Sequence, residues 1–138
     1  MTEFRISEAA ALLGVSDDTV RRWGDTGKLR IRKADSGRQV VEGVDLVPLM
    51  TDAAADSPLE AAFPHARASA RNRLTGIITA VTKDTVMAQV DLQAGPFRIV
   101  SLMSREAADE LGLEPGMLAV ASVKATVVVV ELPEENPA

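Results

Sequence analysis

The chain has 138 residues, of which 46% are hydrophobic and 3% aromatic, so any core must be built chiefly from Val, Leu, Ile and Ala. It has no cysteine, which excludes disulfides, thiolate metal sites and thiol catalysis. The net charge of −5 is unevenly distributed: residues 19–40 hold seven basic and two acidic residues, a local net charge of +5, which indicates a DNA-facing surface on one part of the chain.

The chain divides into zones of different composition. Residues 1–50 are helical and then basic, 51–66 are rich in Ala, Asp and Pro, 67–132 carry β-branched runs, and 133–138 form a polar tail. We therefore predict an α+β fold with two domains, a linker and a frayed tail. The polar N-terminus and the lack of an apolar run of roughly 20 residues predict a soluble, cytoplasmic protein.

Two short helices are predicted first. One runs over Glu8–Leu13, with Ser7 as its N-cap, and Gly14 supplies the left-handed turn after it. Ser16 caps a second helix over 16–26. A short helix, a Gly turn and a capped second helix are typical of a helix-turn-helix.

The second predicted helix has an apolar and a basic side. Val20 and Trp23 are three residues apart and face the core. Arg21 and Arg22 must then project elsewhere. Trp23 is therefore interpreted as a core residue.

Basic residues continue on a predicted β-hairpin. Its strands, Lys28–Lys33 and Gln39–Val44, flank the turn-forming residues 34–37. Asp45 then caps a further turn, Leu46 to Met50, which Pro48 keeps short.

This arrangement predicts that the second helix enters the major groove of DNA while charges on the hairpin contact phosphates beside it. The alternative is an ordinary helical pair whose Arg residues are merely solvated. The residues assigned to DNA contact are Ser16, Thr19, Arg21, Arg22, Lys28, Arg30 and Arg38.

The run FRISEAAALLGVSDDTVRRWGDTGKL, followed by a Gly-Arg hairpin, resembles the MerR/excisionase-type winged helix-turn-helix over about residues 4–50. The resemblance implies that Arg21, Arg22, Arg38 and neighbouring basic residues contact DNA. MerR proteins dimerise through a long helix after this domain. No such helix is predicted here, so dimerisation is expected elsewhere.

The second domain is predicted to be a small OB-like barrel of five strands and one helix. Ser104 can cap the helix, Arg105–Leu111. Val127–Val130 cannot alternate apolar and polar residues, so we expect that strand to be covered on both faces, by the barrel and by a partner subunit. The predicted strands are Leu74–Lys83, Val86–Gln93, Phe97–Met103, Met117–Val123 and Thr126–Leu132.

Three motifs in this domain resemble the Mop/TOBE family, or molbindins, over about residues 67–132. They are Ser69-Ala-Arg-Asn72 before Leu-Thr-Gly, Ile99–Ser104 before the helix EAADELGL, and Lys124-Ala-Thr-Val127. In that family the barrel binds molybdate or tungstate, usually between subunits. A tetrahedral dianion leaves water only where its oxygens meet many donors, and cationic, hydroxyl and backbone N–H groups are the suitable ones.

The resemblance implies an oxyanion site, with molybdate or tungstate as bound ligand and no protein-bound metal ion. Ser101 is included with less support. Ser104 is interpreted as a helix cap, and Asn72 either binds ligand or holds its turn. The assigned residues are Ser69, Ala70, Arg71, Asn72, Ser101, Lys124, Ala125 and Thr126.

Together the two halves predict a molybdate- or tungstate-responsive DNA-binding regulator that associates through its barrels as a dimer or hexamer. A molybdate storage protein, and an architectural DNA-binding protein that uses the barrel only to oligomerise, are the alternatives. No nucleotide-binding loop or catalytic triad can be built, and His65 lies alone in the linker, so an enzyme is not expected. The sequence leaves open the operator, the sign of regulation and the choice between molybdate and tungstate.

Overall fold

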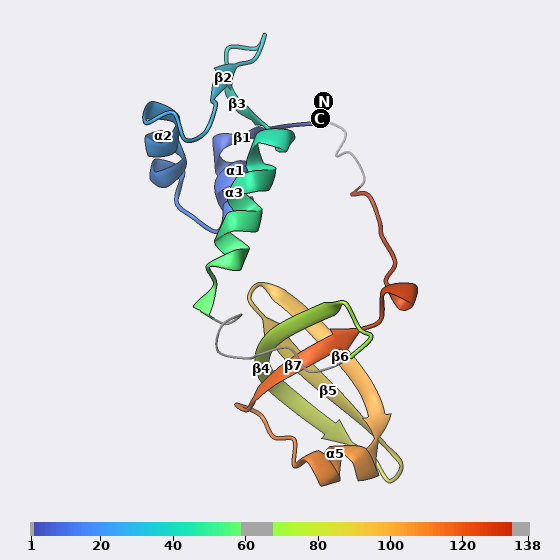
Figure 1. Cartoon of the computed structure of the whole chain (residues 1–138). Coiled ribbons are helices and arrows are strands. Elements are labelled where there is room, and N and C mark those ends of the chain that lie inside the picture. Colours follow the sequence, from blue (N-terminus) through green and yellow to red (C-terminus); the bar gives the residue numbers. More distant parts are fainter. Residues whose placement is uncertain (1, 59–67, 134–138) are drawn as a thin grey trace. The chain divides into compact units, whose positions relative to one another are not determined.

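The computed structural model describes residues 2–58 and 68–133, which fall into two compact units, Met1–Pro64 and His65–Ala138 (Figure 1). Each unit is considered by itself. The expectations for most of the linker, including His65, and for the last five residues of the tail lie outside the described residues.

The described part of the N-terminal unit contains the helices α1, α2 and α3 and a small antiparallel sheet with strand order β1-β3-β2. Ile6, Val20 and Leu46 are buried at the centre of the core between the helices, and Trp23 packs half-buried against it, as predicted. The elements are β1 (Glu3–Arg5), α1 (Ile6–Leu13), α2 (Asp17–Asp25), β2 (Arg32–Lys33), β3 (Gln39–Glu42) and α3 (Gly43–Ala55).

The predicted N-cap is confirmed for α2 and is wrong for α1. Ser16 caps α2 as predicted, because its hydroxyl accepts a hydrogen bond from the Thr19 backbone N–H at 3.1 Å. The prediction of Ser7 as the cap of α1 is wrong, since α1 begins at Ile6 with Arg5 as its N-cap. The Glu8 carboxylate accepts from the Arg5 backbone N–H at 3.0 Å, which fixes the earlier start and lowers the pKa of Glu8.

Two further features of this unit differ from the predictions. Strand β1 was not predicted; it pairs with β3 and places Phe4 opposite Val41. The short turn predicted after Asp45 is a 13-residue helix, α3, so the first residues of the predicted linker are helical. Pro48 is accommodated in the second turn of α3, where it removes one helical hydrogen bond but does not end the helix.

The described part of the C-terminal unit is a curled antiparallel sheet with strand order β6-β5-β4-β7 and the helix α5 (Figure 1). Ser104 caps α5 as predicted, accepting from the Ala107 backbone N–H at 3.1 Å. Ile78, Val90 and Leu92 are buried on the inner face of the sheet. The elements are β4 (Asn72–Lys83), β5 (Met87–Ala94), β6 (Phe97–Ser104), α5 (Arg105–Leu111) and β7 (Leu118–Val123).

The fifth strand predicted over Thr126–Leu132 is not formed in the single chain. A short 3₁₀ turn, η1 (Ala125–Val127), follows β7, and residues 128–133 have no regular structure. A strand needs a neighbour to satisfy its backbone groups, and this segment pairs with no other described strand. The sheet is therefore open between β6 and β7.

Gly76 allows the sheet to curl. Strand β4 pairs with β5 and with β7, and at Gly76 it crosses so close to β5 that an added Cβ would overlap the Gln93 carbonyl and lie 3.0 Å from Ala94 Cα. Both neighbours are backbone atoms, which cannot move aside without disturbing the β4–β5 pairing. Glycine is therefore required at this position by close approach of two backbones.

Replacing Gly76 with Ala should lower the free energy of unfolding of the C-terminal unit by about 1–3 kcal/mol, because the added methyl overpacks the strand crossing. Chemical denaturation would measure the change. Thr82→Ala, at an exposed position on the same strand, is the control and should change stability by no more than about 0.5 kcal/mol. Equal effects of the two substitutions would contradict the packing argument.

Candidate functional site

The pairing of β4 with β7 brings together two motifs that lie some fifty residues apart. Asn72, the first residue of β4, is opposite Val123, the last residue of β7. Residues 69–71 lead directly into β4, and residues 124–126 leave directly from β7. Seven of the eight predicted oxyanion residues therefore lie at one corner of the C-terminal unit, called here the motif corner (residues 69–72 and 124–126).

Hydrogen bonds shape one side of the motif corner. The Asn72 side-chain amide donates to the Val123 carbonyl at 3.0 Å, so Asn72 holds the two strands together rather than its own turn. The Arg71 guanidinium donates to the carbonyls of Ala68 and Ser69, at 3.2 and 3.4 Å. These bonds fold the Arg71 side chain back over the segment that precedes β4.

The cations of this unit fall into two groups. Lys83 donates to Asp109 at 2.6 Å, and Arg98 donates to Asp91 at 2.9 Å. Each bond stabilises the charged carboxylate and lowers the pKa of that aspartate. Arg71 and Lys124 form no ion pair within residues 68–133, so their charges remain available to an anion.

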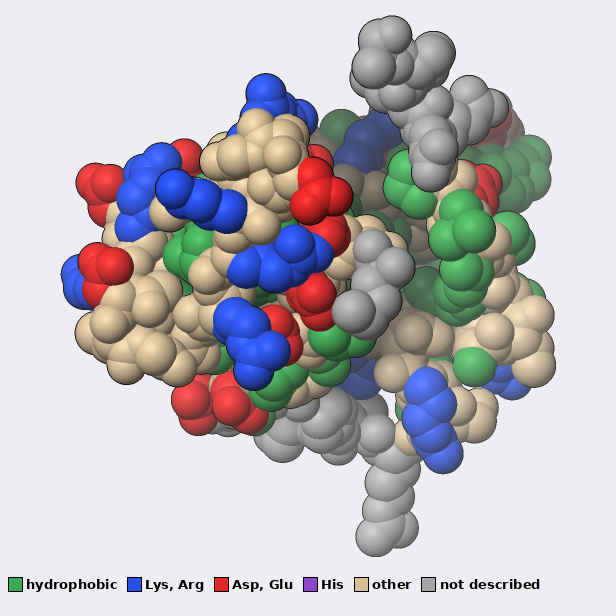
Figure 2. Space-filling model, turned by 90° about the horizontal axis from the view of Figure 1, so that it is seen from above, with side chains coloured by type: hydrophobic (Ala, Val, Ile, Leu, Met, Phe, Trp, Pro, Cys, Tyr) green, Lys and Arg blue, Asp and Glu red, His purple; other side chains and the backbone are tan. Residues whose placement is uncertain are grey.

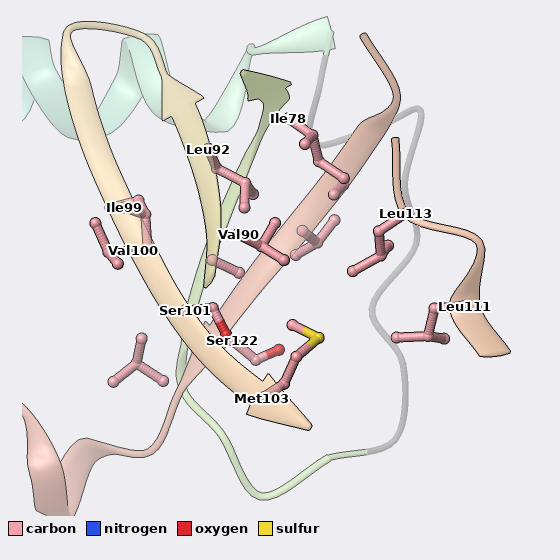
Figure 3. Close-up of a pocket in the computed structure, with 14 residues that line it drawn as sticks. Ile78, Val90, Leu92, Ile99, Val100, Ser101, Met103, Leu111, Leu113 and Ser122 are labelled. Carbon is pink, nitrogen blue, oxygen red and sulfur yellow. The ribbon is translucent and has the colours of Figure 1, made fainter. Parts of the chain in front are cut away.

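Ser101 lies apart from the motif corner. It sits in the middle of β6 opposite Val90 and faces the hollow between β6 and β7, with Ser122 on the other side (Figure 3). That hollow is otherwise lined mainly by apolar side chains, including Ile99 and Met103. Sequence reasoning did not predict this hollow, because it depends on the fifth strand being absent from the chain's own sheet.

Two of the predicted DNA contacts are also structural. The Ser16 and Thr19 hydroxyls lie 2.9 Å apart at the start of α2, and Ser16 caps the helix. Arg21 lies 3.5 Å from Asp18, a weak and exposed pair. Arg22 is exposed and has no ion pair in the described part of the chain, so its guanidinium is free to reach a groove.

The remaining cations lie on the segment between α2 and β3, and Figure 2 shows Lys and Arg side chains on the face that it presents. Lys28 Nζ lies 4.3 Å from the centre of the Trp23 ring, a cation–π contact that the sequence did not reveal. Arg32 is bound to Glu3 and Glu42, which makes it structural. Arg30 and Arg38 are exposed, and among the described residues neither side chain has a charged partner.

Comparison with known proteins defines the class. Residues 5–39 match the MerR family regulatory protein, and residues 68–130 match the TOBE domain. The chain is 40% identical over 63 residues to molybdenum-pterin-binding protein 2 of Clostridium pasteurianum, and this match covers 45% of the chain and 93% of that protein. The chain therefore belongs to the TOBE-domain family and carries a MerR-family region before that domain.

Two other similar proteins were found. The chain is 41% identical over 68 residues to molybdenum-pterin-binding protein MopA of Rhodobacter capsulatus, a match that covers 49% of the chain and only 26% of MopA. The molybdate-binding protein of Sporomusa ovata matches at 30% identity over 49% of the chain and all of that protein, with a TM-score of 0.47. The families found are binding and regulatory families. No helix among the described residues is long and apolar enough to cross a membrane.

Replacing Asn72 with Ala should lower the free energy of unfolding by about 0.5–1.5 kcal/mol, because the hydrogen bond between β4 and β7 is lost. Denaturation of the full chain would measure it. Thr75→Ala is the control, since the Thr75 side chain makes no hydrogen bond within the described residues. An Asn72 variant as stable as the parent protein would show that this bond does not hold the motif corner.

Proposed function

We propose that the protein is a cytoplasmic, molybdate- or tungstate-responsive DNA-binding transcriptional regulator. The observation that carries this proposal is the motif corner, where Arg71 and Lys124, which form no ion pair among residues 68–133, lie on chain segments joined by the Asn72–Val123 bond. The TOBE relatives are named as molybdenum-binding proteins, and the MerR-family region supplies a reason for DNA binding in the same chain.

The chemistry of the motif corner suits a tetrahedral dianion. Arg71 and Lys124 offer charge-assisted hydrogen bonds, and Ser69 and Thr126 offer hydroxyl donors. Backbone N–H groups of Ala70 and Ala125 complete the proposed set. Ser101 is set aside, because it faces the hollow between the sheet edges.

The motif corner of one chain is too open to serve as a complete site. Ser69, Arg71, Lys124 and Thr126 are all exposed, whereas a dianion must exchange its hydration shell for a full set of donors. A second copy of the motif corner, facing the first, doubles the number of donors and excludes water. We therefore place the oxyanion between subunits of a homo-oligomer, either a dimer or a hexamer.

The N-terminal unit is proposed to bind DNA as a winged helix-turn-helix. α2 would enter the major groove, with Arg22 reaching base edges or phosphates, while Arg30 and Arg38 contact the phosphates beside it. Lys28 lies over the Trp23 ring, and Arg21 lies beside Asp18. Lys28 and Arg21 would each have to break this weak contact in order to bind DNA. Ser16 and Thr19 contribute by setting the start of α2.

A storage role is the second candidate. The C-terminal part of this chain alone matches 93% of the length of molybdenum-pterin-binding protein 2. A protein with that name therefore consists almost entirely of the C-terminal unit. In a storage protein, oxyanion binding and DNA binding would be independent. In a regulator, ligand must change DNA affinity, which requires that it bind the DNA-competent and incompetent arrangements differently.

Calorimetric titration of the full chain with molybdate should give tight binding that survives excess sulfate, and a rise in melting temperature. Lys124→Ala should weaken binding at least tenfold by removing a charged donor. Lys83→Ala, which removes a lysine already paired with Asp109, is the matched control and should leave affinity unchanged. If the parent protein gives neither heat nor a rise in melting temperature with molybdate, the proposal that it binds this oxyanion is contradicted.

Arg22→Ala should weaken DNA binding roughly tenfold or more and reduce its salt dependence, while leaving molybdate affinity unchanged. Arg32→Ala is the comparison variant. Because Arg32 is bound to Glu3 and Glu42, its loss should lower the stability of the N-terminal unit rather than remove a DNA contact. Gel-shift titrations with and without molybdate measure both. Loss of molybdate binding in the Arg22 variant would contradict the division of labour between the two units.

A further inference from the structure

One glycine of α2, the helix proposed to enter the major groove, is not required by its backbone conformation. Gly24 lies in the last turn of α2 and does not have the positive φ that favours glycine. Glycine is a poor helix former, so most other residues would suit this position better. A neighbouring side chain excludes them, because an added Cβ would overlap Ile31 Cδ1 and lie 3.0 Å from Ile31 Cγ1. Ile31 therefore occupies the space that a side chain at position 24 would need.

Ile31 belongs to the segment that leads from α2 into the β2–β3 hairpin, called here the hairpin arm (residues 28–33). Leu29 fixes the start of the hairpin arm, because its side chain is buried and its backbone N–H donates to the Trp23 carbonyl at 3.1 Å. Ile31 packs half-buried against the same core. Isoleucine is branched at Cβ and therefore stiff at χ1, which limits how far Ile31 can turn aside. The contact with Gly24 thus limits how closely the hairpin arm approaches α2.

Polar side chains surround this contact. A hollow between α2 and the hairpin is lined by Arg21, Asp25 and Gln39 together with Gly24 and Ile31. The side chains of Arg21, Asp25 and Gln39 are exposed, so they can follow any separation of the two elements. Ile31 is the one apolar side chain that lines this hollow. Direct packing between α2 and the hairpin at this point therefore depends on Gly24 and Ile31.

The contact lies between two cations that are proposed to bind DNA. Arg22 is exposed on α2, two residues before Gly24, and Arg30 is exposed on the hairpin arm, next to Ile31. Phosphate contacts fix the register and orientation of a protein on the duplex. Because the phosphates of DNA are regularly spaced, cations on two separate elements can reach them together only at a suitable separation. The separation of Arg22 from Arg30 therefore matters for binding.

We propose that Gly24 and Ile31 form a spacer that sets the separation between α2 and the hairpin arm, and thereby matches Arg22 and Arg30 to the DNA backbone. This inference rests on the proposed DNA binding of the N-terminal unit. Gly24 is a positioning residue, because it acts through Ile31 and offers DNA no side chain. A methyl group at position 24 pushes the hairpin arm away from α2, so that the two cations no longer reach phosphates together.

The separation can be measured on the full chain without DNA. The chain has no cysteine, so spin labels can be placed on Asp18→Cys in α2 and Asp35→Cys in the hairpin turn, both at exposed positions. Pulsed electron resonance should show a longer distance between the labels in Gly24→Ala. Adding Ile31→Val should restore the parent distance, because valine lacks the Cδ1 atom that the new methyl overlaps. An unchanged distance in Gly24→Ala would show that Ile31 simply turns aside, and would overturn the proposal.

Gel-shift titrations of the unlabelled full chain with a mixed-sequence DNA duplex, at several salt concentrations, test the consequence for binding. Gly24→Ala should weaken binding several-fold and reduce the salt slope by about one, as expected for one lost phosphate contact. The double variant with Ile31→Val, and Ile31→Val alone as the matched control, should bind as the parent protein does. If the labels move apart while affinity and salt slope stay unchanged, the spacer does not position the cations and the proposal is overturned. If the parent protein itself fails to bind DNA, the proposed function fails, whereas the label distance still decides whether the spacer exists.

Discussion

The antiparallel pairing of β4 with β7 is the constraint on which the candidate oxyanion site depends. β4 pairs with β7 along its first half and with β5 along its second half, and its first residue meets the last residue of β7. The two cationic segments are therefore adjacent only when this pairing is in register. Gly76 permits the tight crossing with β5, and the Asn72–Val123 bond holds the end of the pair.

Local signals in the sequence predicted most elements of the C-terminal unit. Alternating β-branched residues and Gly turns placed the first four strands to within about two residues, and a capping serine placed α5. They failed for Thr126–Leu132, because a strand is defined by its partner and not by propensity alone. The same absence of a partner explains why the hollow between β6 and β7 could not be predicted from the sequence.

In the N-terminal unit, the wrong predictions concern elements that depend on contacts between residues far apart in the sequence. β1 is too short to show a period, and it forms because β3 offers it an edge. α3 continues past Pro48 because Leu46 is anchored in the core and outweighs the loss of one hydrogen bond. Among the basic residues, charge alone did not separate Arg32, which binds two glutamates, from Arg22, which binds no carboxylate among residues 2–58 and 68–133.

Residues 124–126 follow directly from β7, so the position of Lys124 in the motif corner is set by that strand. In the proposed homo-oligomer, a facing motif corner of a second copy completes the donor set around the oxyanion. A ligand that binds only this arrangement stabilises it by RT ln(1 + [L]/Kd), about 2.7 kcal/mol at a hundredfold excess over Kd. The oxyanion could then control how two DNA-binding units are paired on half-sites without altering either unit internally. Sensing in this chain would be a change in association, and the N-terminal unit needs no oxyanion contact of its own.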